Sequence, residues 1–199
     1  MRRIVMFNRV TADGFFAGPD GNLDWAVADE ELDKAATKGM PRAGTILLGR
    51  RTYELFEGFW PHALDDSPTA PDPHGPDRRS PEIRAMATFM NESTKVVFSR
   101  TLEDVTWRNS RLVAEFDPRE IEAMKDEPGK DMIVLGSGSI VSQLTQHGLI
   151  DEYQLVVSPI FLGSGQPLLS DVSKSSKLDL LEASKYRSGN VMLRYARRK

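Results

Sequence analysis

The sequence predicts one α/β domain built on a mostly parallel sheet that ends in an antiparallel hairpin. Two observations carry this prediction. Short Val, Ile and Leu runs, typical of strands buried on both faces, alternate with helical patterns over the first three quarters of the chain. Beyond residue 150 the pattern becomes β-rich and includes the hairpin signal Ser188-Gly189-Asn190. The length of 199 residues suits one domain with some decoration.

The expected strands are the apolar runs, taken in chain order. The parallel part comprises Arg3 to Val10, Thr45 to Leu48, Lys95 to Ser99, Arg111 to Ala114 and Asp131 to Leu135. The C-terminal part comprises Glu152 to Leu162, Lys177 to Tyr186 and Val191 to Arg197.

The helices between these strands are predicted from their caps. Asp117 precedes a proline and stands three residues before a glutamate, which is a capping-box pattern, and Ser80 begins a similar one. Ser139 to His147 is helical and stops at Gly148. Ala28 to Lys38 is a mostly polar helix, for which Asp24 is the expected cap, while Asp29, Glu30 and Glu31 are expected on its solvated face. The segment Pro61 to Pro81 holds six of the twelve prolines and predicts a long surface loop. The alternatives for this loop are a lid and a disordered or partner-contacting segment.

The composition excludes several classes of function. With 26 basic and 29 acidic residues the net charge is −3, which argues against a nucleic-acid or anionic-membrane partner. There is no cysteine, so disulfides, Cys-ligated metals and thiol catalysis are excluded, and we expect a reducing compartment, the cytoplasm. No apolar run approaches the roughly 20 residues that a membrane helix needs. The three histidines lack ligand spacing, so no metal site is predicted.

Three strand ends carry residues suited to phosphate. The first strand end is Leu48-Gly49-Arg50-Arg51-Thr52, where Thr52 is the expected helix cap. The second has Ser99 and Arg100, and the third runs through Gly136-Ser137-Gly138-Ser139-Ile140 into a helix. Each could be an ordinary strand–loop junction when taken alone. Together they predict a dinucleotide site for a ligand with an extra phosphate, which means NADPH more readily than NADH.

A long glycine-rich loop follows the first strand and ends at Trp25. Its aromatic residues could cover a flat ring. Glu30, if it faces a cleft, is the candidate polar group for a heterocycle.

These motifs, in this order, resemble the dihydrofolate reductase superfamily. They are more similar to the reductase domain of bacterial riboflavin-biosynthesis deaminase-reductases. The matching stretches are TADGFFAGPDGNLDW, LLGRRTYE, VVFSR and IVLGSGSIVSQL with GLIDEYQLVVSPIFLGSGQPL, which span nearly the whole chain. The resemblance implies a three-layer fold in a single domain over residues 1–199, and a homodimer that pairs through the β-rich stretch Glu152 to Leu162.

The resemblance also assigns roles to residues. It places Gly49, Arg50, Arg51 and Thr52 at the 2′-phosphate and pyrophosphate of NADPH, Ser99 and Arg100 on the adenosine side, and Gly136 to Ile140 under the pyrophosphate. Ser137 departs from the usual pair of adjacent glycines. Ala17 and Gly18 would lie against the nicotinamide. Asp13 and Gly14 would lie by the substrate, with Trp25 and Glu30, and the expected catalytic residues are Asp13 and Glu30.

The implied activity is an NADPH-dependent reductase acting on a small heterocyclic substrate. The first expectation is the reduction of 5-amino-6-(5-phosphoribosylamino)uracil, with Asp13 orienting the ribose carbonyl. Alternatives are a pterin or dihydrofolate reductase, in which Glu30 would bind the ring, and an NADPH reductase of this fold with another substrate. A nucleotide-binding module without turnover is the alternative from another class.

Overall fold

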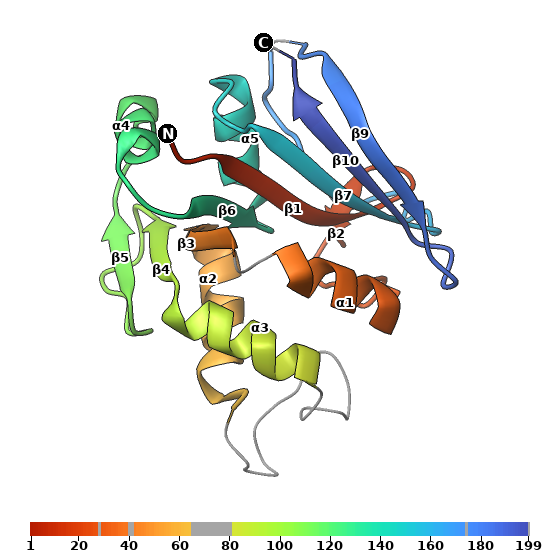
Figure 1. The fold of residues 1–199 in the computed structure, drawn as a ribbon, viewed down its shortest axis with the longest axis horizontal. Coiled ribbons are helices and arrows are strands. Elements are labelled where there is room, and N and C mark those ends of the chain that lie inside the picture. The colour runs from red at the N-terminus through yellow and green to blue at the C-terminus, as the bar shows by residue number, and fades with distance from the viewer. Residues whose placement is uncertain (28, 40–41, 65–80, 174, 199) are drawn as a thin grey trace.

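An eight-stranded sheet forms the middle layer of the protein, with helices on both of its faces (Figure 1). The computed structural model describes residues 1–27, 29–39, 42–64, 81–173 and 175–198. Its strands are β1 (Ile4–Thr11), β3 (Ala43–Gly49), β4 (Thr94–Phe98), β5 (Ser110–Val113), β6 (Asp131–Leu135), β7 (Glu152–Ser158), β9 (Leu178–Lys185) and β10 (Val191–Arg197). The helices are α1 (Glu30–Gly39), α2 (Arg50–Glu57), η2 (Trp60–His62), α3 (Pro81–Glu92), α4 (Pro118–Asp126) and α5 (Gly138–Gln146).

The strand order is β5-β4-β3-β6-β1-β7-β10-β9. All pairs from β5 to β7 are parallel, and β10 runs antiparallel to both of its neighbours. The predicted parallel sheet with an antiparallel C-terminal hairpin is therefore confirmed. The predicted strands lie within about two residues of the observed ones, except that β7 ends at Ser158 rather than at Leu162.

The alternation of side chains along each strand divides the core between the two faces of the sheet. On β3, Leu47 packs with the α4 and α5 face, while Ile46 and Leu48 pack with α2 and α3. Leu32 of α1 packs against β7 and β10 in a third cluster. Three layers result, as the resemblance implies.

The predicted helix caps have mixed outcomes. Asp117 caps α4 by accepting from the amide of Arg119 at 2.8 Å, and Gly148 follows α5 with a φ of +65°, as expected. The cap of α1 is Asp29 and not Asp24: its carboxylate accepts from the amide of Leu32 at 3.0 Å. The prediction failed because helix α1 begins at Glu30, five residues beyond Trp25.

Two short strands add a second sheet that the sequence did not reveal. Strand β2 (Phe15–Ala17) pairs antiparallel with β8 (Gln166–Pro167). Gly165, just before β8, lies so close to β2 that a Cβ there would meet the carbonyl oxygen of Ala17 at 2.5 Å. Strands of three and two residues carry no periodicity that a sequence pattern could detect.

Two further expectations meet the structure in part. Within the predicted loop Pro61 to Pro81, the first residues belong to η2 and to the turn after it, and Pro81 begins α3. Residues 65–80 lie outside the described part of the chain.

Strand β7, expected at a homodimer interface, has β1 and β10 on its two edges. The free edge of this part of the sheet is β9, which exposes Leu180 and Leu181. The homodimer stays a prediction.

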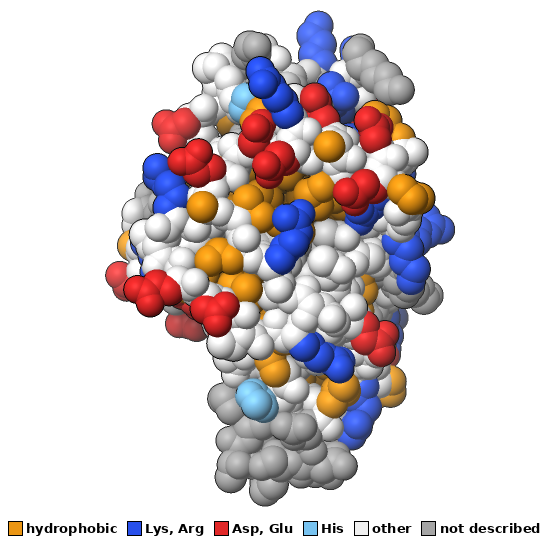
Figure 2. All heavy atoms as spheres, turned by 90° about the vertical axis from the view of Figure 1, so that its left-hand side faces the viewer, with side chains coloured by type: hydrophobic (Ala, Val, Ile, Leu, Met, Phe, Trp, Pro, Cys, Tyr) orange, Lys and Arg blue, Asp and Glu red, His pale blue; other side chains and the backbone are white. Residues whose placement is uncertain are grey.

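Charged side chains of both signs are interspersed over the face of the molecule that Figure 2 shows, which is the left-hand side of Figure 1. In the described ranges, no helix has the length and apolar character to cross a bilayer. The same ranges contain no group of three His, Asp or Glu residues placed to hold a metal ion.

A buried lysine closes the end of α3. Lys95, at the start of β4, is 0% exposed. Its ammonium donates to the carbonyl oxygens of Met90 at 2.9 Å and Ser93 at 2.8 Å, and it lies 4.3 Å from the centre of the Trp107 ring. These are the carbonyl groups that a helix leaves without partners at its C-terminus.

Lys95 is expected to make stability depend on pH. Burial, with the nearby charge of Arg108, lowers the pKa of Lys95 from 10.5 to about 8. Between these two pH values the unfolded chain binds more protons than the native one, so the free energy of unfolding rises with pH. Denaturant titrations from pH 8 to 10 should show this rise in the parent and not in Lys95→Met. Equal slopes in both proteins would mean that the carbonyl groups keep Lys95 charged.

Candidate functional site

The three strand ends that the sequence singles out lie side by side. Strands β4, β3 and β6 are consecutive neighbours and parallel, so their carboxyl ends meet at one edge of the sheet. Ser99 and Gly136 directly follow β4 and β6, and Gly49 is the last residue of β3 between them. Ligands of open α/β sheets bind outside this edge, because the loops there leave helix N-termini facing solvent.

Two of these ends are hydrogen-bonded to each other. The hydroxyl of Ser137 accepts from the amide of Gly49 at 2.9 Å, and the amide of Ser137 donates to the hydroxyl of Thr52 at 3.0 Å. The approach is close: a Cβ on Gly136 would lie 3.1 Å from the methyl carbon of Thr52. Thr52 was expected to cap α2, and this was wrong. The helix begins at Arg50, and Thr52 joins α2 to the turn before α5.

The backbone of the turn before α5 is unusual. Gly136 and Ser137 have φ values of +56° and +57°, and Ser137 is the N-cap of α5 in a left-handed conformation. A serine with positive φ is uncommon and is tolerated only where surrounding contacts hold it, here the two hydrogen bonds just described. This turn is where the sequence departs from two adjacent glycines. The two hydrogen bonds, from Gly49 to the Ser137 hydroxyl and from the Ser137 amide to Thr52, hold the turn against the start of α2 and are called the clasp below.

The clasp brings two helix N-termini to the same place. Among the described residues, the amides of Arg50 and Arg51 in the first turn of α2 have no hydrogen-bond acceptor, and neither do those of Gly138 and Ser139 in α5. Free amides and the positive end of the helix dipole favour an anion. Ile140 contributes by packing: it is 3% exposed and lies below Gly49, where a Cβ would meet it at 3.4 Å.

The arginines at this edge differ in their surroundings. Arg50 lies 3.6 Å from the carboxylate of Glu54, one turn further along α2. Arg51 and Arg100 are exposed, and no ion pair or hydrogen bond occupies either guanidinium in the part of the chain that the structure describes. Ser99 is engaged by its own turn, since its hydroxyl accepts from the amide of Leu102 at 3.0 Å.

The loop after β1 crosses in front of α5. The Phe16 ring packs on the first residue of α5, so that a Cβ on Gly138 would lie 2.6 Å from a ring carbon. Ala17 is 3% exposed, and Gly18 begins a tight loop in which its amide donates to the carbonyl oxygen of Asn22 at 3.0 Å. The predicted nicotinamide-side residues thus lie next to the predicted phosphate-side helix.

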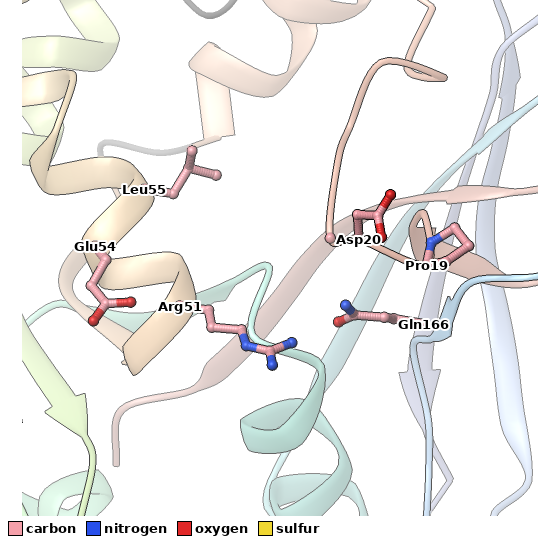
Figure 3. A pocket seen from close by; sticks show the side chains of 7 residues that line it. Pro19, Asp20, Arg51, Glu54, Leu55 and Gln166 are labelled. Atoms are coloured by element: carbon pink, nitrogen blue, oxygen red, sulfur yellow. The ribbon is translucent and has the colours of Figure 1, made fainter. Parts of the chain in front are cut away.

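A pocket of about 480 Å³ lies between α2 and this loop (Figure 3). The guanidinium of Arg51 extends from α2 toward the carboxamide of Gln166 on β8, and Asp20 lies beside it on the loop. The volume falls within the range of small-molecule sites. The remaining lining residues are Pro19, Gly21, Glu54 and Leu55. Except for Arg51, none of these residues is predicted at the site from the sequence. The signal for Gln166 is its place in the GSGQPL stretch.

Asp13 and Gly14 form the turn that leaves β1. The carboxylate of Asp13 accepts from the hydroxyl of Thr11 at 2.5 Å and from the amides of Leu162 at 3.1 Å and Gly163 at 2.8 Å. The Thr11 hydroxyl, with the two amides, lowers the pKa of Asp13. Gly14 has a φ of +88°. The carboxylate therefore ties two loops together, and its low pKa makes it a poor proton donor near neutral pH.

Glu30 lies in a different groove, of about 410 Å³, with Lys34, Arg187 and Ser188. Its side chain is 95% exposed and lies 3.9 Å from the ammonium of Lys34. The neighbouring Asp29 is the engaged carboxylate, because it accepts from the hydroxyl of Ser188, which lowers its pKa. Asp29 was expected on a solvated face; instead it joins α1 to the β9–β10 turn.

Trp25, predicted at the substrate, is a core residue with 7% exposure. Its indole N–H is buried and has no acceptor within the described ranges. The oxygen of the Asn8 carboxamide, on β1, is likewise buried and unpartnered. Buried polar groups without a protein partner are rare in folded proteins, and an ordered water or a ligand often supplies their hydrogen bond.

Comparison with known proteins places the chain in a family. A family model for the RibD C-terminal domain matches residues 2–192. The uncharacterized protein YyaP of Bacillus subtilis is 29% identical over 194 residues, which cover 98% of this chain and 94% of that protein.

Two solved structures show the same fold. A putative riboflavin biosynthesis protein from Shewanella sp. PV-4 has a TM-score of 0.72 at 20% identity, with both chains covered in full. Dihydrofolate reductase from Enterococcus faecalis, complexed with NADP(H), has a TM-score of 0.61 at 13% identity over 99% of this chain and 97% of that one. The fold is thus the three-layer fold of dihydrofolate reductases, and family and fold are those of reductases. Since the family model spans nearly the whole chain, the protein belongs to the RibD C-terminal domain family.

Proposed function

We propose that the protein is an NADPH-dependent reductase of a small heterocyclic substrate. The observation that carries the proposal is the clasp between Thr52 and Ser137, which sets two helix N-termini side by side at the edge of a pocket that Arg51 enters. Free amides at helix N-termini and unpaired guanidinium groups are both suited to the phosphates of a dinucleotide. The family and the fold, both of reductases, point in the same direction.

The residues present fit NADPH. The free amides of α2 and α5 would hold the pyrophosphate, and the approach of Gly49 to Gly136 and Ser137 leaves the backbone open to it. Arg50, Arg51 and Arg100 are the cations available for the 2′-phosphate. When bound, NADPH supplies a hydride.

The chain itself supplies position. The paired strands β2 and β8 hold Ala17 and Gly18 in front of α5, where the nicotinamide side of the cofactor is expected. Asp13 fixes the loop after β1 to Leu162 and Gly163. With these oxygens engaged and its pKa lowered, Asp13 would orient the substrate side of the site rather than protonate the substrate.

For the substrate, we propose the ribose carbonyl of 5-amino-6-(5-phosphoribosylamino)uracil, as in the reductases of riboflavin biosynthesis. The placement of Glu30 supports this over a pterin. A carboxylate that binds a pterin ring works best when partly buried, where its pKa can rise. Glu30 is almost fully exposed and lies in the second groove with Arg187.

Calorimetric titrations with NADPH and NADH test the cofactor, and NADPH oxidation tests the substrate. The expected result is tighter binding of NADPH than of NADH, with oxidation in the presence of 5-amino-6-(5-phosphoribosylamino)uracil and none with dihydrofolate. Binding without oxidation across a panel of pyrimidines and pterins would favour the nucleotide-binding module instead. If the protein binds neither dinucleotide, the proposal of an NADPH-dependent reductase is wrong.

A further inference from the structure

Three polar side chains from separate segments meet in the pocket between α2 and β8. They are Arg51 on α2, Asp20 on the loop after β2, and Gln166 on β8 (Figure 3). Among the described residues, no hydrogen bond or ion pair engages any of these three side chains. Other side chains of the same types do find partners; Arg2, for example, is bonded to Thr45 and to the carbonyl oxygen of Lys130. Unpaired groups that converge on one concave site indicate a ligand that completes them.

The pocket has two different walls. Arg51 comes from α2, the helix whose N-terminus is assigned to the cofactor phosphates. Asp20 and Gln166 come from the opposite wall, which the paired strands β2 and β8 build. Gln166 is the backbone partner of Ala17 in this small sheet, so its carboxamide starts beside the nicotinamide-side loop.

The position of Gln166 is held by backbone contacts rather than by its side chain. Gly165 must be a glycine to let β8 approach β2, and Gly21, across the loop, would place a Cβ 3.5 Å from the Gln166 nitrogen. The pairing of β8 with β2 therefore fixes the backbone of Gln166, while its side chain lines the pocket without a partner among the described residues. A carboxamide placed in this way is available to a ligand that enters the pocket.

We propose that Gln166 is the specificity-determining residue of the site and that it recognises an amide edge, –CO–NH–, of the substrate ring. This inference rests on the proposed function and assigns the residue that recognises the ring of the proposed substrate. A carboxamide presents one acceptor and one donor in a plane, and the complementary surface is a carbonyl beside an N–H. The carboxylate of Asp20, which only accepts, is suited to an amino group on the same ring.

The aminopyrimidinone ring of the proposed substrate carries both this amide edge and an amino group. A pair of matched probes separates this class from others. The first is 5,6-diaminouracil, which carries the amide edge. The second is 5,6-diamino-1,3-dimethyluracil, in which both ring N–H groups are methylated while the carbonyl and amino groups remain.

The test is calorimetric binding of each probe to the protein saturated with NADP⁺, which cannot react. We expect the parent to bind 5,6-diaminouracil at least about tenfold more tightly than the dimethyl probe. The dimethyl probe has no ring N–H, so the carboxamide oxygen of Gln166 would lose its hydrogen-bond donor. Gln166→Met keeps the length of the side chain and should abolish this preference. Gln166→Glu keeps the acceptor but loses the donor, and should weaken the first probe by a similar factor.

Controls separate recognition from folding and from cofactor binding. Gln146→Met alters a glutamine that bonds to Ser173 beside the far end of α5, and it should leave both probes unaffected. Thermal unfolding and NADPH titration of each variant show whether fold and cofactor site survive. The two Gln166 variants are expected to unfold at the temperature of the parent, and all three variants are expected to bind NADPH as the parent does.

Each alternative outcome overturns the inference in a different way. If Gln166→Met binds both probes as tightly as the parent does, Gln166 does not recognise the amide edge. If that variant loses NADPH affinity instead, Gln166 contacts the carboxamide of the cofactor. If the parent binds NADPH but neither probe, the proposed substrate class is wrong while the reductase assignment stands. If it binds no NADPH, the proposed function fails first and this inference fails with it.

Discussion

Replacing Arg50 and Arg51 together by alanine is expected to weaken NADPH binding about a hundredfold and to change NADH binding by no more than about threefold. Hydrogen bonds to charged groups contribute about 1.5–3 kcal/mol each, and the 2′-phosphate, which NADH lacks, is the group these arginines would hold. Arg51 contributes most in this expectation, since its guanidinium is unpaired in the described structure while Arg50 lies near Glu54. Calorimetric titration of both dinucleotides against both proteins gives the comparison.

A matched control removes two positive charges elsewhere. Arg42 and Arg108 are both exposed. Arg42 directly precedes β3 and Arg108 comes shortly before β5, so both lie at the amino edge of the sheet, opposite the proposed site. Arg42→Ala with Arg108→Ala should leave the preference for NADPH intact. If the Arg50 and Arg51 variant loses the same affinity for NADPH and for NADH, these arginines bind the pyrophosphate, and their assignment to the 2′-phosphate is wrong.

The sequence was informative about the fold because its signals were local and repeated. Continuous apolar runs marked the parallel strands, and Asp117 and Gly148 marked helix ends through capping rules that depend on a few adjacent residues. Three strand ends with phosphate-suited residues were combined into one predicted dinucleotide site. The structure adds the strand order, in which β4, β3 and β6 are parallel neighbours.

The rest depended on contacts between distant residues. The local sequence predicts Thr52 as a helix cap, but in the fold its hydroxyl accepts a hydrogen bond from the amide of Ser137, 85 residues away. Asp29 was predicted on a solvated face, but the β9–β10 turn brings Ser188 into hydrogen-bond contact with it, and Glu30 beside it lines the second groove. Gln166 enters a pocket only because β8 pairs with β2, a sheet too short to leave a pattern. Local rules cannot supply such partners.

Gly138→Ala is the second change with a large expected effect. In an open helix position, replacing glycine by alanine stabilises a protein by about 0.4–1 kcal/mol, because the unfolded chain loses freedom. At Gly138 the new Cβ would lie 2.6 Å and 2.9 Å from two carbons of the Phe16 ring, so the ring must move. Overpacking of this kind costs about 1–3 kcal/mol, which outweighs the gain. Chemical denaturation should show a net loss of stability.

The same change should also reduce cofactor affinity, because Phe16 immediately precedes Ala17 and Gly18 in the loop that faces α5. Gly58→Ala is the matched control: Gly58 ends α2 with ordinary helical angles and a Cβ there meets only backbone oxygens at 3.6 Å, so this variant should be neutral or slightly stabilised.

A double-mutant cycle locates the cause. If the collision with Phe16 is what destabilises Gly138→Ala, then combining it with Phe16→Ala must cost clearly less than the sum of the two single changes, since the methyl group would enter space that the ring has left. Additive losses would place the strain in the backbone of the turn at Gly136 and Ser137 instead. Recovery of NADPH binding in the double variant would further mean that the amides at the start of α5, and not the Phe16 ring, are what the cofactor needs at this point.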